Sequence, residues 1–100
     1  MNKTKVRNIE IYQIRRNKAG DFLFVIPADT SVSPIDDFSL DGDDLILRHE
    51  DGRLTRLLEL PDSFISKIRQ AQSVRVVESR DQKPVADHLV TNREPLRTAP

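Results

Sequence analysis

The sequence of 100 residues predicts a small α+β domain over residues 1–80, followed by a disordered C-terminal tail over residues 81–100. Two pairs of apolar runs separated by turn residues predict two β-hairpins. One segment with apolar residues at helical spacing predicts an amphipathic helix, and a short apolar run after it predicts a terminal strand. We therefore expect a small, mainly antiparallel sheet with the helix on its apolar face.

The first hairpin is predicted over residues 8–28, with a turn at Asn17–Gly20 because glycine readily adopts positive φ. On the strand before this turn the apolar alternation shifts phase after Ile11, which predicts a bulge or a strand covered on both faces. The strand after the turn is apolar on both faces, and such a strand needs cover on each side. Phe22 and Phe24 are therefore candidate contacts with a protein partner.

Residues 28–43 are predicted to form a loop, because Ser, Thr, Asp and Pro34 disfavour a long helix. From Asp37 onward the sequence partly follows the calcium-binding loop of an EF-hand, with Gly42 at the sixth position. The twelfth position is Arg48, a cation where that loop requires a bidentate glutamate. We interpret the segment as a polar turn around Asp41-Gly42 and predict no metal site.

The second hairpin is predicted over residues 44–60, with Asp51-Gly52 as a two-residue type I′ turn. This register places His49 opposite Leu54, so we expect His49 to be a histidine at the surface edge and not a catalytic base or metal ligand. The predicted core face of the hairpin consists of leucines, namely Leu45, Leu47, Leu54, Leu58 and Leu60.

Residues 60–72 are predicted to be helical, with Pro61 in the first turn and apolar residues such as Phe64 and Ile68 on one face. Residues 73–80 read as the terminal strand. From Asp81 onward the periodicity ends and prolines recur, which predicts disorder. Residues 85–90 are an apolar island that could become ordered on a partner, and Leu89 is the third candidate partner contact.

The composition excludes several kinds of function. The chain has no cysteine, so it can form no disulfide, thiolate metal site or cysteine nucleophile. It shows no phosphate-binding loop, no dinucleotide fingerprint and no Ser/His/Asp signature, and its two histidines, His49 and His88, have no metal-ligand spacing. We therefore expect a protein that is not an enzyme and that binds no cofactor, metal or small molecule.

The N-terminus is basic but lacks the apolar segment of a signal peptide, and no apolar run is long enough to span a membrane. We therefore expect a cytoplasmic protein without membrane contact.

The formal net charge is zero, but the charges are segregated along the chain. Residues 1–27 carry six basic and two acidic side chains, residues 28–51 carry one and eight, and residues 52–80 carry six and three. One interpretation is that these blocks lie side by side and neutralise one another. The alternative is that Arg15, Arg16 and Lys18, around the first hairpin turn, contact nucleic-acid phosphates.

Residues 8–60 also carry a set of short motifs in a fixed order: Gly20, Val25-Ile26-Pro27, Leu40, Gly42-Asp43 and Asp51-Gly52-Arg53-Leu54. This order resembles the swapped-hairpin family of bacterial transition-state regulators and antitoxins. The resemblance implies an interleaved homodimer whose first hairpin binds DNA through Arg15, Arg16 and Lys18. It also implies that the C-terminal tail engages a toxin.

The function expected from the sequence is that of a non-enzymatic protein-interaction module, either a homodimer or a subunit of a larger assembly. The expectation depends on the lack of a catalytic motif, the small amount of core material and the apolar strand that needs cover on both faces. DNA binding through the first hairpin is the alternative.

Overall fold

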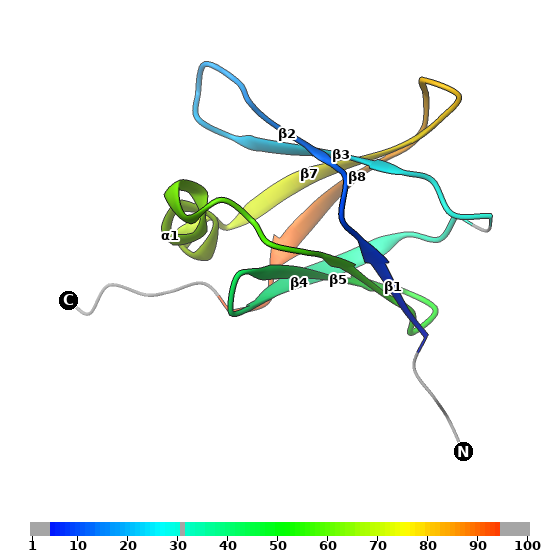
Figure 1. Cartoon of the computed structure of the whole chain (residues 1–100), viewed down its shortest axis with the longest axis horizontal. Helices are drawn as coiled ribbons and strands as arrows, with labels where there is room; N and C mark the ends of the chain where they lie inside the picture. Colours follow the sequence, from blue (N-terminus) through cyan, green and yellow to red (C-terminus); the bar gives the residue numbers. More distant parts are fainter. Residues whose placement is uncertain (1–4, 31, 95–100) are drawn as a thin grey trace.

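The computed structural model describes residues 5–30 and 32–94, and these residues form eight strands and one helix. All eight strands belong to one mixed sheet that curls into a half-barrel (Figure 1). Its strands, in spatial order, are β1 (Val6–Ile9), β6 (Leu54–Leu57), β5 (Asp44–His49), β4 (Ile35–Asp41), β8 (Lys83–Asn92), β7 (Ser73–Arg80), β3 (Phe22–Pro27) and β2 (Gln13–Arg16).

The half-barrel consists of two four-stranded halves that meet at a narrow junction. The first half is β1-β6-β5-β4 and the second is β8-β7-β3-β2, and the β4–β8 junction has only two residue pairs, Asp37 with Thr91 and Phe38 with Asn92. The two edge strands, β1 and β2, are joined by residues 10–12 alone. We call the gap between these two edges the seam; the Tyr12 hydroxyl spans it by donating to the Leu58 carbonyl oxygen over 2.8 Å.

The predicted fold class is wrong, because the sheet is neither small nor mainly formed by two antiparallel hairpins and a terminal strand. The observed sheet has eight strands instead of five, and three of its seven pairings, β1–β6, β3–β7 and β4–β8, are parallel. Residues 35–41, predicted as loop, form β4, which pairs with β5 along almost its whole length. The predicted chain reversal at Asp41-Gly42 is confirmed, because it forms the β4–β5 turn with Gly42 at a φ of 61°.

The predicted tail is wrong as well, because residues 83–92 form β8 in the middle of the sheet. β8 pairs antiparallel with β7 from Lys83 to Thr91. The turn between them is formed by Asp81 and Gln82, which have φ angles of 54° and 65°. Non-glycine residues rarely adopt these angles, so the sequence carries no recognisable turn signal here. Residues 95–100 of the predicted tail lie outside the described residues.

The second hairpin exists, but its predicted register is wrong by one residue. The Gly52 amide donates to the His49 carbonyl oxygen and the His49 amide donates to Arg53, which makes a three-residue loop with Gly52 at a φ of 91°. A shift of one residue turns a strand over. As a result Thr55 and Leu57 face the core, whereas the predicted Leu54 and Leu58 are only half-buried.

The helix and two further predictions are confirmed. Helix α1 (Asp62–Gln70) occupies the predicted segment, residues 73–80 form a strand, and the first hairpin turns at Asn17–Gly20. Helix α1 packs Phe64, Ile65 and Ile68 against one end of the half-barrel interior, where the Phe64 and Phe22 rings meet edge to face at 5.6 Å. This helix, the one that the described residues form, is too short to cross a membrane.

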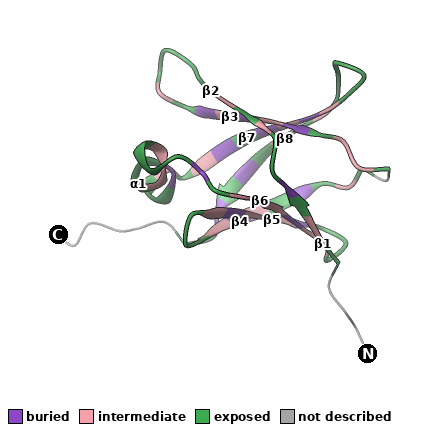
Figure 2. Ribbon diagram, viewed as in Figure 1, coloured by how far each residue is buried: buried purple, intermediate pink, exposed green. Residues whose placement is uncertain are grey.

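Buried residues occur along the strands of the curled sheet (Figure 2), and their chemical character differs between the two ends of the interior. The end next to α1 is filled with apolar side chains, and its largest include Phe22, Phe24, Leu45, Leu57 and Ile68. Asn92 closes this end by donating to the carbonyl oxygens of Arg69 and Ala71 at the C-terminus of the helix. The opposite end holds the buried polar residues His49, Thr55 and Glu78.

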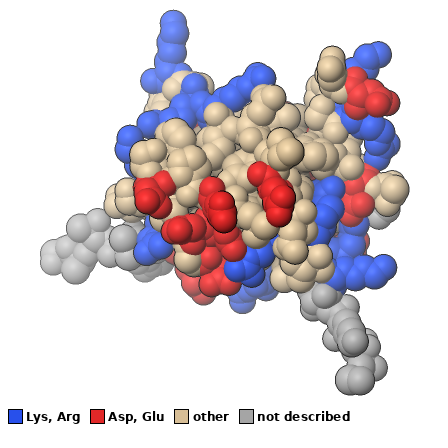
Figure 3. Space-filling model, viewed as in Figure 1, with Lys and Arg blue, Asp and Glu red and all other residues tan. Residues whose placement is uncertain are grey.

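The charges are unevenly spread over the surface. Figure 3 shows basic side chains on the projecting end of the β2–β3 hairpin, and acidic side chains gathered between α1 and the β4–β5 turn. The acidic residues 37, 41 and 44 pair with Arg48 and Arg56 in the first half of the sheet. The charge blocks therefore neutralise one another only in part.

Candidate functional site

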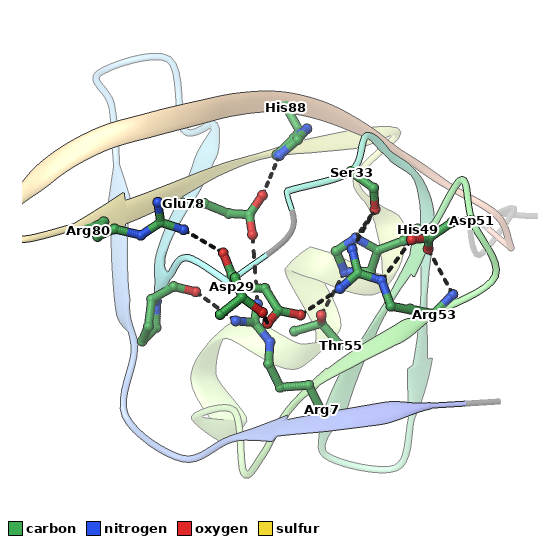
Figure 4. Close-up of polar contacts among 12 residues, drawn as sticks. Arg7, Asp29, Ser33, His49, Asp51, Arg53, Thr55, Glu78, Arg80 and His88 are labelled. Carbon is green, nitrogen blue, oxygen red and sulfur yellow. Dashed lines mark hydrogen bonds and ion pairs between the residues drawn. The ribbon is translucent and has the colours of Figure 1, made fainter. Parts of the chain in front are cut away.

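The most elaborate group of polar side chains lies at the end of the interior away from α1 (Figure 4). We call it the polar cluster. It draws on both halves of the sheet and on the residues between β3 and β4. Its members are Arg7, Asp29, Ser33, His49, Arg53, Thr55, Glu78 and His88.

Glu78 is the most deeply buried charged residue of the polar cluster. It continues the inward-facing row of β7 after Val74 and Val76, and it has no solvent exposure. One carboxylate oxygen, Oε2, lies 2.8 Å from Nε2 of His88, and the other, Oε1, lies 3.8 Å from Nη2 of Arg7. Burial makes these partners necessary, because a carboxylate away from water is strongly destabilising without them.

Arg7 links the two halves of the sheet across the seam. Its Nη1 donates to the carbonyl oxygen of Pro27 over 3.0 Å, while Nη2 faces Glu78. Among the described residues, the buried atoms Arg7 Nε, Arg7 Nη2 and Glu78 Oε1 have no hydrogen-bond partner. The Arg7–Glu78 contact is therefore an ion pair without a direct hydrogen bond.

His49 is buried within the polar cluster, contrary to the prediction of a surface-edge position. Its Nδ1 lies 3.1 Å from the Ser33 hydroxyl and its Nε2 lies 2.7 Å from the Thr55 hydroxyl. Burial lowers the pKa of the imidazole from its ordinary value of 6.5, which favours the neutral ring. A serine beside a histidine is the pair that nucleophilic catalysis uses, but here the third group is a threonine hydroxyl instead of the carboxylate that stabilises an imidazolium.

Arg53 binds three other polar side chains at the solvent-facing side of the polar cluster. Its guanidinium donates to Asp29 over 2.6 Å, to Asp51 over 2.8 Å and to the Ser33 hydroxyl over 2.9 Å. The pKa of Asp29 is lowered chiefly by the hydrogen bond from the Thr30 amide, and that of Asp51 chiefly by the bond from the Arg53 amide. Through these bonds Arg53 holds Asp29 and Ser33, which precede β4, against the β5–β6 turn.

A cleft of about 610 Å³ opens beside the polar cluster. Lys5, Arg7 and Arg53 contribute positive charge to its walls, and Asp29 and Asp51 contribute negative charge. Both carboxylates are bound to Arg53, so charges of both signs are already paired within the wall. The cleft therefore offers no strong field of one sign to a charged ligand.

The segment that partly follows a calcium-binding loop places its carboxylates against arginines. Asp37 lies 3.4 Å from Nε of Arg48, and Arg56 contacts both Asp41 and Asp44. Among residues 5–30 and 32–94, no group of three or more His, Asp or Glu side chains is arranged to hold a metal ion.

The three predicted nucleic-acid contacts lie together on β2 and the turn that follows it. Arg15, Arg16 and Lys18 are all exposed. The Arg16 guanidinium lies 5.0 Å from the centroid of the Phe22 ring, and Arg15 donates to the Gln13 side chain. None of the three forms an ion pair with a carboxylate of the described residues.

The three predicted partner contacts lie in different places. Phe22 and Phe24 are 4% and 0% exposed and belong to the core, so neither reaches the surface of this chain. Leu89 is 71% exposed on the outer face of the second half of the sheet. Other apolar side chains share this face on neighbouring strands, and we call the set the β7–β8 face: Leu23, Val25, Val77, Val85 and Leu89.

A second surface feature, which the sequence did not predict, lies where the seam meets α1. It is a groove of about 450 Å³ that we call the seam groove. Its apolar wall includes Ile11, which is 86% exposed. Its full lining is Glu10, Ile11, Tyr12, Ile14, Glu59, Pro61 and Phe64. The phase shift after Ile11 is a break between β1 and β2, instead of the predicted bulge or strand covered on both faces.

The inward orientation of Glu78 could also have been predicted from the sequence. Val74 and Val76 were predicted to point inward, and alternation places residue 78 on the same face. A glutamate in that row requires a buried partner, although the sequence does not identify Arg7 and His88 as the partners.

Comparison with known proteins gives no family or function. No protein-family model matches the chain, and neither curated proteins nor solved structures show a significant match. The swapped-hairpin resemblance gains no support from these comparisons, and the strands of residues 8–60 pair within a single eight-stranded sheet of this chain.

Proposed function

We propose that the protein is an interaction module that pairs with a second copy of itself through the β7–β8 face. The observation that carries this proposal is the 71% exposure of Leu89 on a regular sheet face. Val85, further along the same strand, is 45% exposed, and Val25 and Val77 are cross-strand neighbours on the same face. Covering these side chains with another sheet removes apolar area from water, which is the main driving force of association.

The charges on this face favour a second copy as the partner. A two-fold interface brings the same patch against itself, so a patch of one sign would repel its copy. Here Arg75 and Asp87 lie among the apolar residues and pair with each other, so their charges balance, and Arg15 opposite Leu23 on β2 lies at the border of the face. The small size of the domain adds a reason, because a chain of 100 residues buries a limited core by itself.

The test is sedimentation velocity of the purified protein over a range of concentrations. We expect a reversible dimer in the wild-type protein and a monomer in the Leu89→Lys variant, since a lysine within the covered face would have to be desolvated. Ile11→Lys is the matched control, because Ile11 is even more exposed but lies in the seam groove. A wild-type protein that stays monomeric, or a Leu89→Lys variant that dimerises equally well, would contradict the proposal.

Nucleic-acid binding through the β2–β3 hairpin is a second candidate function. The observation that favours it is that Arg15, Arg16 and Lys18 project together without an ion pair to the described carboxylates, while the acidic block pairs with Arg48, Arg53 and Arg56 instead. Exposed cations on a hairpin can contact phosphates in a groove of duplex DNA.

Fluorescence anisotropy with random duplex DNA at several salt concentrations tests this second function. Phosphate contacts predict an affinity that falls steeply with salt and that is lost when Arg15, Arg16 and Lys18 are all replaced by Glu. Absence of binding at low salt, or binding that survives the triple substitution, would remove this candidate.

A further inference from the structure

The seam groove combines apolar side chains with acidic residues that pair with no basic side chain of residues 5–30 and 32–94. Ile11, Ile14 and Phe64 form its apolar part, and Glu10 and Glu59 lie in its wall. In the part of the chain that the structure describes, neither glutamate forms an ion pair with lysine or arginine. The arginine-bound aspartates of the first half of the sheet are different, because their charge is already balanced.

The negative charge extends beyond the groove along α1. An adjoining depression is lined by Asp43 and Asp62 together with a single cation, Arg69. Figure 3 shows acidic side chains gathered across this face of the molecule. Burial raises the pKa of the Tyr12 hydroxyl first, and the carboxylates of Asp44 and Glu59 raise it further. Because Glu10 and Glu59 lack a basic partner among the described residues, the groove favours a partner that brings positive charge.

The backbone holds Glu59 in place beside the groove. Glu59 has a φ of 55°, a left-handed conformation that is strained for a residue with a side chain. Its amide donates to the Asp44 carboxylate over 2.9 Å, and the following Leu60 amide donates to the Asp43 carbonyl oxygen over 2.7 Å. These bonds from the β4–β5 turn fix the backbone at Glu59, and with it the position from which the exposed side chain projects beside the groove.

The shape of the partner follows from the neighbouring strand. β2, which contributes Ile14 to the groove, is an edge strand of the sheet. The outer backbone groups of an edge strand are available to pair with an added extended segment, and alternate side chains of that segment then enter the adjacent groove. A helix would use the apolar groove but would leave the strand edge unpaired.

We infer that the seam groove binds an extended segment of another protein in which basic side chains flank an apolar one. The apolar side chain packs against Ile11, Ile14 and Phe64, and the basic side chains, two positions away on the same face of the segment, face Glu10 and Glu59. The segment lies at the Gln13 end of β2, because Arg15 and Arg16 at the other end would repel its basic side chains. This surface is separate from the β7–β8 face, so the inference does not depend on dimer formation.

The experiment measures binding of three fluorescein-labelled synthetic peptides to the full chain by anisotropy. In all three, each valine has a second residue two positions before and after it, with serine between them, so that both side chains point to the same face of the extended peptide. The second residue is lysine, glutamine or glutamate. We expect binding of the lysine peptide, weaker binding of the glutamine peptide and none of the glutamate peptide. In Glu59→Lys we expect the lysine peptide to bind about tenfold more weakly, because an attractive contact becomes repulsive.

Two control variants separate the groove from general charge and from the dimer surface. Glu50→Lys makes the same change of net charge at an exposed site on the β5–β6 turn and should leave binding unchanged. Leu89→Lys should also leave it unchanged, whereas Ile11→Lys should weaken it. Equal binding of the lysine and glutamine peptides, equal effects of Glu59→Lys and Glu50→Lys, or no peptide binding at all would each overturn the inference.

Discussion

The two ends of the half-barrel interior are built on the same sheet face but are stabilised in different ways. Along β7 the inward row runs Val74, Val76, Glu78, so the change from one end to the other takes place within a single strand. At the apolar end, stability depends on the volume that side chains fill. At the polar end it depends on whether each buried group keeps its partner. A substitution that removes buried volume should therefore destabilise the fold at the apolar end. A substitution that removes the partner of a buried polar group should destabilise it at the polar end.

The largest effect is expected at the apolar end, from Phe24→Ala. Phe24 is fully buried between its neighbours Ile14 and Val76 on adjacent strands. Removing the ring leaves a cavity and should lower the free energy of unfolding by about 4 kcal/mol. Urea denaturation measures the change, with Phe24→Leu as the milder control. A loss below about 1 kcal/mol for Phe24→Ala would mean that this end repacks freely, which a close-packed core does not do.

The next effect is expected at the polar end, from Arg7→Leu. This change leaves the carboxylate of Glu78 buried with only His88 beside it, and it should lower the free energy of unfolding by about 3 kcal/mol. The double variant Arg7→Leu/Glu78→Leu should recover most of the loss, because a buried ion pair can be replaced by apolar side chains at little cost. If the double variant is less stable than Arg7→Leu, then the contribution of Arg7 is packing and not charge pairing.

A smaller effect is expected from pH, through His49. Burial lowers its pKa in the folded chain, so the unfolded chain takes up a proton first as the pH falls. Stability should therefore be complete above pH 6.5 and decrease as the pH falls from 6.5 toward the lower pKa of the folded state. Urea midpoints at a series of pH values should show this step in the wild-type protein and lose it in His49→Gln.

A separate acid step should remain in His49→Gln. The carboxylates with lowered pKa values lose their stabilising contribution only as the pH falls below 3.8, their ordinary value, and they are Asp29, Asp44, Asp51 and Asp87. A first step of equal size in His49→Gln and in the wild-type protein would assign it to a group other than His49.

The same contrast explains which parts of the fold could be predicted from the sequence. Helix α1, the first hairpin and β7 were predictable because apolar periodicity and glycine-containing turns mark them directly. β8 was not, because its inward row includes Ala86, His88 and Asn92 and its turn lacks glycine. A strand with a polar interior does not show the apolar alternation that identifies a half-buried strand.

The candidate sites were predictable to a lesser degree. Leu89 was recognised as a partner contact, but for a disordered tail and not for a strand, and its role in binding stays a prediction. His49 alternates with the inward Leu45 and Leu47, and its burial was missed because the segment before β4, from which Ser33 contacts the ring, was predicted as a loop without contacts to the hairpin. The three-residue loop at Asp51-Gly52 was missed as well, and it decides that Thr55 and Leu57 face inward. The seam groove joins residues 10–14 to residues 59–64, and no local pattern reports such a contact.

The smallest effect is expected from Arg75→Gln, on the outer surface. Arg75 and Asp87 form an ion pair like that of Arg7 and Glu78, but both side chains are largely exposed to water. In water, attraction is weak, salt screens it, and ordering two long side chains offsets what remains. We therefore expect the urea midpoint of Arg75→Gln to match that of the wild-type protein within error at physiological salt, measured at a concentration where both are monomeric. A loss as large as that of Arg7→Leu would show that exposure does not separate the two pairs, and that the polar end of the interior owes its stability to something other than buried charge.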